Sequence, residues 1–298
     1  MPVHHLGAPR ASSEAVETFV RGGLSFDVAD WGDAAAEPVI LLHGFPETSA
    51  SFSAVAGSLA AAGYRALAPD QRGYSPGARP TGRAAYRTTE LVDDVLALAD
   101  AAGADRFHLV GHDWGGIVAW HVGGLHPDRL RTLTVLSTPH PRAFARSLLR
   151  SPQAFRSWYV LAFQVPGLPE RSMLANDGAP LRRALRSSGL DAAAADSYVA
   201  AMQQPGAMTA ALNWYRALPL GALPLGARAT AALPSITVPT CYVWSTGDTA
   251  LDRAAAEATG RYVTGPYRFE VLDGVSHWVP EEAPERVTAM LLEQFRGT

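Results

Sequence analysis

The sequence contains no lysine, because all 25 of its basic residues are arginine. Schiff-base chemistry, attachment of pyridoxal phosphate and the P-loop lysine are therefore excluded. Cysteine is almost absent as well: Cys241 is the single one, which excludes an intramolecular disulfide and a zinc site built from several cysteines. We expect a site that uses neither a cofactor nor a metal.

Charge of either sign is scarce. Charged residues make up 18% of the 298 residues, apolar residues make up 48%, and the net charge is −3. Nothing in this balance draws the chain towards nucleic acid or anionic lipid. No apolar run approaches the roughly 18 residues of a transmembrane helix, and the N-terminal residues lack an apolar signal-peptide core. We expect a cytoplasmic protein that binds neither nucleic acid nor membrane; its oligomeric state is left open, with a homodimer as one candidate.

Short apolar runs rich in β-branched residues alternate with helical patterns. This alternation predicts an α/β fold, a mostly parallel central sheet flanked by helices. Buried strands are predicted over five runs, 39–42, 106–110, 133–136, 241–244 and 269–272. The clearest helical spacings cover 88–103 and 284–297, and a pair of strands is expected between 17 and 31.

One region breaks this alternation. From 140 to 234, helical stretches interrupted by proline-rich turns replace the strand pattern, and aromatic residues gather in two clusters. We expect a helical cap domain over 140–234, inserted into an α/β core formed by residues 1–139 and 235–298. An insertion at this point can cover a site on the core.

The strongest chemical signal is the segment GHDWGG at 111–116, between a predicted buried strand and a predicted helix. It has the form of a nucleophile elbow, G-x-Nuc-x-G, with Asp113 at the nucleophile position. The turn strains the backbone of the central residue, and side chains at Gly111 and Gly115 would clash. The simpler alternative is a glycine-rich turn whose aspartate only caps the helix. The matching strand and helix favour Asp113 as a nucleophile.

The loop HGFP at 43–46 follows the first core strand. In an architecture with such an elbow, this loop supplies one backbone amide of an oxyanion hole, and the residue after the nucleophile supplies the other. The expected donors are the amides of Phe45 and Trp114. Taken alone, the loop is more simply explained as a rigid turn.

A base and an acid follow later in the chain. His277 comes directly after the last predicted strand and is the expected general base, oriented by Asp248 after the strand before it. Asp252 is the weaker candidate acid, because it is better placed as a helix cap. The chain order of nucleophile, acid and histidine is the order that this kind of elbow requires. Asp113, Asp248 and His277 are therefore predicted to form a catalytic triad.

The α/β-hydrolase-fold epoxide hydrolases have segments similar to four in this chain: the loop at 43–46, the elbow at 111–116, and the segments that carry Asp248 and His277. The resemblance extends from about residue 20 to the C-terminus. The resemblance implies the α/β-hydrolase fold and an epoxide substrate. The segment NWYR at 213–216 is similar to the family segment with one ring-opening tyrosine, and Tyr159, five residues before Gln164, matches the other. The resemblance therefore implies that Tyr159 and Tyr215 are catalytic. We expect the substrate to contact aromatic side chains: Phe45, Trp114, Trp158 and Trp214.

An aspartate nucleophile restricts the substrate by itself. Attack on an amide or ester would give a reactive anhydride, whereas attack on a saturated carbon bearing a leaving group gives an alkyl ester that water can cleave. An epoxide and an alkyl halide both fit. An opening epoxide needs a proton donor, which a neutral tyrosine provides, whereas a halide is held by N–H donors such as indoles.

We predict an epoxide hydrolase that converts an epoxide to a vicinal diol through an ester on Asp113, with a role in detoxification. The alternative is a haloalkane dehalogenase with the same nucleophile, although Phe45 replaces the Asn or Glu common there. Enzymes acting on fluoroacetate carry Arg where this chain has Trp114. A non-catalytic binding protein on this fold is a further alternative, against which the complete set of reactive groups argues.

Overall fold

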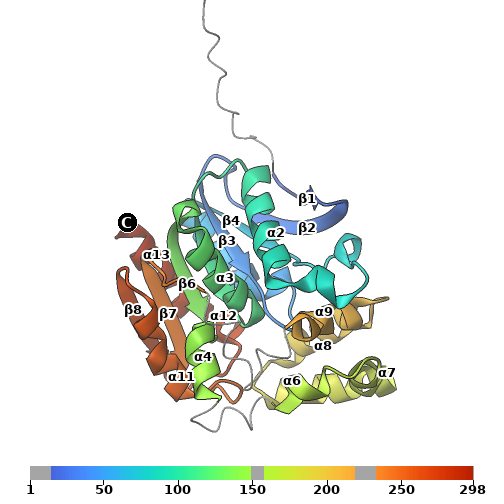
Figure 1. Ribbon diagram of the computed structural model, residues 1–298. Coiled ribbons are helices and arrows are strands. Elements are labelled where there is room, and N and C mark those ends of the chain that lie inside the picture. The colour runs from blue at the N-terminus through green and yellow to red at the C-terminus, as the bar shows by residue number, and fades with distance from the viewer. Residues whose placement is uncertain (1–14, 149–157, 219–232, 298) are drawn as a thin grey trace, which may run out of the picture.

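The structure is a computed structural model that describes residues 15–148, 158–218 and 233–297 (Figure 1). An eight-stranded sheet runs through its centre in the order β1-β2-β4-β3-β5-β6-β7-β8. The strands are β1 (Thr18–Arg21), β2 (Leu24–Trp31), β3 (Glu37–Leu42), β4 (Tyr64–Pro69), β5 (Phe107–His112), β6 (Leu130–Leu136), β7 (Thr240–Ser245) and β8 (Tyr267–Leu272). Strands β3 to β8 are parallel to one another, and β2 is antiparallel to β4 and β1. The mostly parallel sheet predicted from the sequence is confirmed.

Helices cover both faces of the sheet, which explains why its central strands are continuously apolar. In β3, Ile40 and Leu42 pack into one hydrophobic cluster with α2 and α3, whereas Val39 and Leu41 pack into another with α1 and α13. Figure 1 shows α2 and α3 in front of the sheet. The flanking helices are α1 (Ser53–Ala61), α2 (Thr88–Ala101), α3 (Trp114–Leu125), α4 (Pro141–Ser147), α11 (Arg253–Ala258), α12 (Val279–Glu282) and α13 (Pro284–Arg296).

Strand β4 is absent from the five predicted runs. Its apolar pattern is interrupted by Arg65, whose side chain is nevertheless 1% exposed because its guanidinium lies 2.7 Å from the buried carboxylate of Asp30. From the sequence alone, an arginine predicts a surface position, because arginine is seldom fully buried unless it is paired. Short 3₁₀ helices complete the core: η1 (Ser49–Phe52), η2 (Pro76–Ala78), η3 (Arg83–Tyr86), η4 (Pro127–Arg129) and η6 (Thr259–Tyr262).

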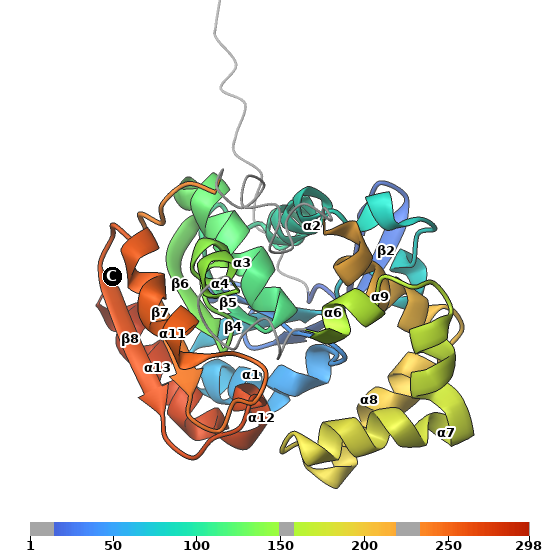
Figure 2. The ribbon, with the colours of Figure 1, turned by 60° about the horizontal axis from the view of Figure 1, so that its bottom comes forward.

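A group of helices separates β6 from β7 in the chain. After α4 come α6 (Trp158–Ala162), α7 (Leu168–Ser187), α8 (Ala192–Gln203) and α9 (Ala207–Ala217), and we call α6–α9 the cap helices. Figure 2 shows them together at one side of the core. Helix α7 is broken at Ala175–Gly178, where the backbone leaves helical geometry. Treating 140–234 as a separate cap domain remains a prediction.

Within the described residues, none of the helices combines the length and the apolar character that crossing a membrane requires.

Candidate active site

The elbow is a tight turn between two buried elements. Strand β5 ends at His112 and α3 begins at Trp114, so Asp113 is the single residue between them, with φ 48° and ψ −116°. Positive φ is uncommon for a residue with a side chain and stores strain at functional turns. A Cβ added to Gly111 would lie 2.3 Å from the Gly115 carbonyl oxygen, and one added to Gly115 would lie 2.2 Å from that of Leu42. The predicted clashes at both glycines are confirmed.

Three side chains from three different loops meet beside this turn. The Nδ1 atom of His277 lies 2.8 Å from Oδ2 of Asp248, and its Nε2 atom lies 3.5 Å from Oδ2 of Asp113. The other oxygen of Asp248 accepts hydrogen bonds from the amides of Ala250 at 2.7 Å and Leu251 at 2.9 Å. Asp248 is thereby fixed, and it orients the imidazole so that Nε2 faces Asp113. The structure brings together all three residues that the sequence predicted as a triad.

The charges of this group support one another. Burial alone would raise the pKa of Asp113, but the hydrogen bond and charge of His277 lower it below its ordinary value. Burial alone would lower the pKa of His277, but Asp248 and Asp113 raise it well above its ordinary value. The resting site therefore holds an ionised Asp113 against a protonated imidazole.

The second oxygen of Asp113 faces the loop after β3. The amide of Phe45 donates to Oδ1 at 2.9 Å. Gly44 makes this approach possible, because a Cβ on it would lie 2.4 Å from Cβ of Asp113. The amide of Trp114, predicted as the second donor, belongs to the first turn of α3, where amides have no acceptor within the helix. One predicted oxyanion donor already contacts the carboxylate, and the other is adjacent in the chain.

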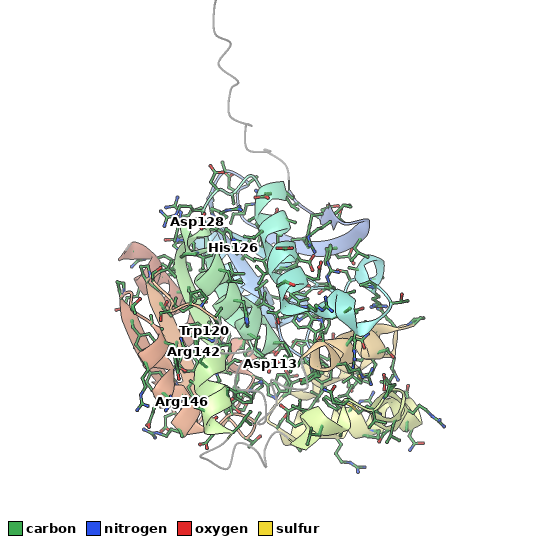
Figure 3. All side chains as sticks on the ribbon, in the orientation of Figure 1. Asp113, Trp120, His126, Asp128, Arg142 and Arg146 are labelled. Atoms are coloured by element: carbon green, nitrogen blue, oxygen red, sulfur yellow. The ribbon has the colours of Figure 1, made fainter. Side chains whose placement is uncertain are left out.

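Aromatic rings from the cap helices pack above Asp113, which Figure 3 shows at the end of α3 nearest those helices. The ring of Tyr215 lies 4.8 Å from Trp114, 5.4 Å from Phe45 and 6.2 Å from Tyr159, measured between centroids. Burial and the negative charge of Asp113 are among the causes that raise the pKa of both tyrosines, so each remains a neutral phenol. The structure thus groups Tyr159, Tyr215, Phe45 and Trp114 around the nucleophile.

The other two residues predicted to contact the substrate are Trp214 and Trp158. The indole N–H of Trp214 donates to the Arg72 carbonyl oxygen at 2.8 Å, and its ring packs edge-on against Trp114 at 5.6 Å. Trp214 is 2% exposed, so it packs against Trp114 with almost no free surface of its own. The side chain of Trp158 lies outside the described residues.

A buried ion pair behind the site was not identified from the sequence. Nδ1 of His112 lies 2.8 Å from Oε1 of Glu47, and both side chains are fully buried. Burial alone would lower the pKa of His112, but Glu47 raises it above its ordinary value. Nε2 of the same ring donates to the His277 carbonyl oxygen at 2.9 Å. The other oxygen of Glu47 accepts from the amide of Gly44 at 2.6 Å. One pair therefore holds the backbone beside both Phe45 and His277. The sequence offers one sign of this pair, because Glu47 directly follows a predicted apolar strand and the loop after it.

A second acidic group joins the core to a cap helix. The hydroxyl of Tyr198, in α8, donates to Glu281, in α12, at 2.8 Å. Burial and the charge of Glu47 raise the pKa of Glu281 to about 8, so this carboxyl is neutral over most of the physiological range. Among the residues that the structure describes, no three His, Cys, Asp or Glu side chains are grouped so as to hold a metal ion.

Comparisons with known proteins agree with this geometry. Residues 37–284 match the model of the α/β hydrolase fold family. Epoxide hydrolase A of Mycobacterium tuberculosis is 33% identical, over 98% of this chain and 99% of that protein. The AB hydrolase superfamily protein YfhM of Bacillus subtilis is 37% identical, over 92% of this chain and 96% of that protein. The crystal structure of epoxide hydrolase A from Mycobacterium thermoresistibile matches with a TM-score of 0.79 and 32% identity, over 96% and 98% of the two chains.

The elbow geometry predicts that one methyl group added at Gly115 strongly destabilises the protein. We expect Gly115→Ala to lower the free energy of unfolding by about 3 kcal/mol, because the backbone of β3 has to move. The matched control is Gly57→Ala on the exposed side of α1, where an added Cβ meets nothing within 4 Å. This control should raise the free energy by about 0.5–1 kcal/mol. Denaturant unfolding measures both, and equal stability of the two variants would contradict the tight turn.

Proposed function

Because the chain belongs to the epoxide hydrolases of the α/β-hydrolase fold, we propose that it hydrolyses an epoxide to a vicinal diol through an ester on Asp113. The observation that carries this proposal is the ionised Asp113 carboxylate, which contacts His277 on one side and the Phe45 amide on the other. Two neutral phenols, Tyr159 and Tyr215, lie near enough for the charge of Asp113 to raise the pKa of each. This set supplies a nucleophile, a base and two proton donors.

In the first step, Oδ2 of Asp113 attacks a carbon of the epoxide ring, and the carbon–oxygen bond of the ring breaks. Oδ1 remains on the Phe45 amide and becomes the carbonyl oxygen of the ester. The epoxide oxygen develops negative charge and takes a proton from Tyr159 or Tyr215, which burial keeps protonated until then. The product of this step is a hydroxyalkyl ester on Asp113.

Ester formation itself prepares the second step. Once Asp113 is esterified, its negative charge no longer raises the pKa of His277, so the imidazolium becomes a better acid. Its proton can then restore the phenol that was deprotonated in ring opening. The neutral imidazole, held by Asp248, deprotonates a water that attacks the ester carbonyl. The amides of Phe45 and Trp114 stabilise the charge on Oδ1. The bond between the carbonyl carbon and Oδ2 then breaks, Oδ2 leaves with the diol and takes the proton of the newly added hydroxyl, and the Asp113 carboxylate is restored.

The proposal includes a division of labour along the chain. Core segments 1–139 and 235–298 carry the nucleophile, acid and base, whereas the cap at 140–234 carries the two tyrosines on α6 and α9. A cytoplasmic location, a homodimer and a role in detoxification remain expectations from the sequence.

The dehalogenase alternative fits the contacts less well. A departing halide needs free N–H donors near the nucleophile, but the indole of Trp214 donates to the Arg72 carbonyl. The ring of Trp114 packs edge-on against Tyr215 at 4.8 Å between centroids. The indole N–H of Trp214 is therefore engaged, whereas the tyrosines offer O–H donors.

The proposed mechanism predicts that the ester on Asp113 accumulates when the base is removed. With His277→Gln, ring opening should proceed while hydrolysis slows by roughly 10²–10⁴-fold, because the base is lost. Intact-mass measurement after incubation with styrene oxide should then show the protein plus one substrate. Asp113→Ala is the matched control and should gain no mass. Diol formation by His277→Gln at the wild-type steady-state rate would contradict the roles of both residues.

The two phenols predict a loss confined to ring opening. Tyr159→Phe/Tyr215→Phe should reduce the rate of ester formation from styrene oxide by roughly 10²–10⁴-fold, since no proton donor remains. Tyr86→Phe is the matched control, because Tyr86 donates to the Pro80 carbonyl away from the pocket, and it should keep the wild-type rate.

An unchanged rate in the double variant would remove the tyrosines from the mechanism. Halide release from chloroalkanes or bromoalkanes by the wild-type protein, with no diol from styrene oxide, would favour the dehalogenase.

A further inference from the structure

Two side chains tie the helix that carries Tyr215 to the segment that carries Tyr159. Arg216, next to Tyr215 in α9, donates from Nε to the Phe163 carbonyl oxygen at 2.8 Å and from Nη2 to that of Val165 at 3.2 Å. Gln164 reaches in the opposite direction and donates to the Tyr215 carbonyl oxygen at 2.9 Å. These reciprocal bonds join two segments that lie about fifty positions apart in the chain. We call Arg216 and Gln164 the strap.

The C-terminal end of helix α6 is held by outside contacts. The described part of this helix is Trp158–Ala162. Its last carbonyl groups have no partner within the helix. The strap supplies donors here, because Gln164 bonds the Val160 carbonyl oxygen at 3.3 Å and Arg216 bonds that of Phe163 just beyond the helix. The position of Tyr159 in α6 therefore depends on where the strap holds this segment.

A third element anchors the strap. Nη1 of Arg216 lies 2.7 Å from Oε1 of Glu170 in the first turn of α7, and the two side chains are 7% and 12% exposed. Burial alone would raise the pKa of Glu170, but the hydrogen bond and charge of Arg216 lower it. The three nitrogens of one guanidinium thus bind three separate partners, which a lysine ammonium on a single atom cannot reproduce.

The strap also acts directly on the aromatic pocket. The ring of Phe163 packs against both tyrosines, with centroids 5.5 Å from Tyr159 and 5.0 Å from Tyr215, and the two tyrosine rings also contact each other at 6.2 Å. The backbone carbonyl of Phe163 is the one that Arg216 binds at 2.8 Å. The guanidinium therefore fixes the backbone of the residue whose ring packs against both phenols.

We propose that Arg216, together with Gln164, is a positioning residue for ring opening: it holds the hydroxyls of Tyr159 and Tyr215 at one spacing above Asp113. The inference rests on the proposed roles of these tyrosines and deepens them. Arg216 does not touch the substrate and acts only through the tyrosines. Misplacing a reacting group by about 1 Å can cost roughly 10²-fold in rate, so the strap should govern ring opening and leave the core residues Asp248 and His277 unaffected.

The test isolates ring opening in the His277→Gln protein. Styrene oxide is added under single-turnover conditions, and the growth of the ester is followed by quenched intact-mass measurement. Arg216→Met should slow ester formation by about 10- to 100-fold, and Gln164→Met should slow it by a smaller factor. Arg182→Met is the matched control, because Arg182 pairs with Asp196 on the cap surface, and it should change the rate less than about 2-fold.

A second comparison separates positioning from general stability. When Tyr159→Phe/Tyr215→Phe is already present, Arg216→Met should cause no further slowing, because no phenol remains to be positioned. A merely structural role would slow ester formation by the same factor with or without the phenols. That result would overturn the inference, and so would wild-type rates in both Arg216→Met and Gln164→Met.

Failure of the proposed function looks different from these outcomes. No ester in the His277→Gln protein, or an unchanged rate after Tyr159→Phe/Tyr215→Phe, would remove the proposed function and the inference with it. If Arg216→Met does not fold, Gln164→Met alone decides, because Gln164 is the neutral member of the strap and removing it leaves no buried charge unpaired.

Discussion

The contact between Asp113 and His277 is the interaction on which the proposed mechanism depends. At 3.5 Å between Oδ2 and Nε2, each group holds the other in its charged form inside a buried pocket. A buried charge is costly without a partner, and Asp113 keeps one besides His277, the amide of Phe45, so the carboxylate can still react when the histidine is replaced. The pair therefore stores a nucleophilic carboxylate and one proton together. Ester formation removes the negative charge of Asp113, and this loss allows the imidazolium of His277 to release its proton. The same contact therefore links the first step of the reaction to the second.

The fold builds this contact from the carboxyl ends of its parallel strands. Asp113 follows β5, Asp248 follows β7 and His277 follows β8, and parallel strands bring these ends to one edge of the sheet. The backbone around the histidine is then fixed by hydroxyl groups from neighbouring strands. Ser245 donates to the Ser276 carbonyl oxygen at 2.7 Å, and Ser137 donates to that of His277 at 3.0 Å. The imidazole is rigid because several elements hold the residues on either side of it.

The parts that the sequence predicts are those governed by local pattern. The apolar runs locate β3 and β5 to β7, because a strand covered on both faces needs apolar residues throughout. The run at 269–272 also marks a strand, but the prediction that it is buried is wrong, because β8 lies at the edge of the sheet and only Leu272 in it is buried. The elbow is predicted because its glycines and Asp113 act within one turn. The strand β4 is missed because Arg65 interrupts its pattern and finds its partner, Asp30, far away in the chain.

The supporting contacts escape prediction for a related physical reason. Glu47, which follows β3, pairs with His112 at the end of the neighbouring strand β5, and nothing near either residue in the sequence indicates the partner. Arg216 binds backbone carbonyls, which every residue carries, so no residue type marks its targets. The residue type alone does not distinguish Arg216, which is buried, from Arg183 and Arg186, which are exposed. Long-range contacts to the backbone appear only once the chain is folded.

The formation of a bond between Asp113 and carbon is tested most directly by the origin of the diol oxygen. Enzyme in excess over epoxide is allowed one turnover in ¹⁸O-water, and the isotope content of diol and protein is measured. The mechanism predicts ordinary oxygen in the first diol, taken from Oδ2, and one heavy oxygen in the Asp113 carboxylate. Heavy oxygen in the first diol, with an unlabelled carboxylate, would mean direct attack by water and would contradict the ester.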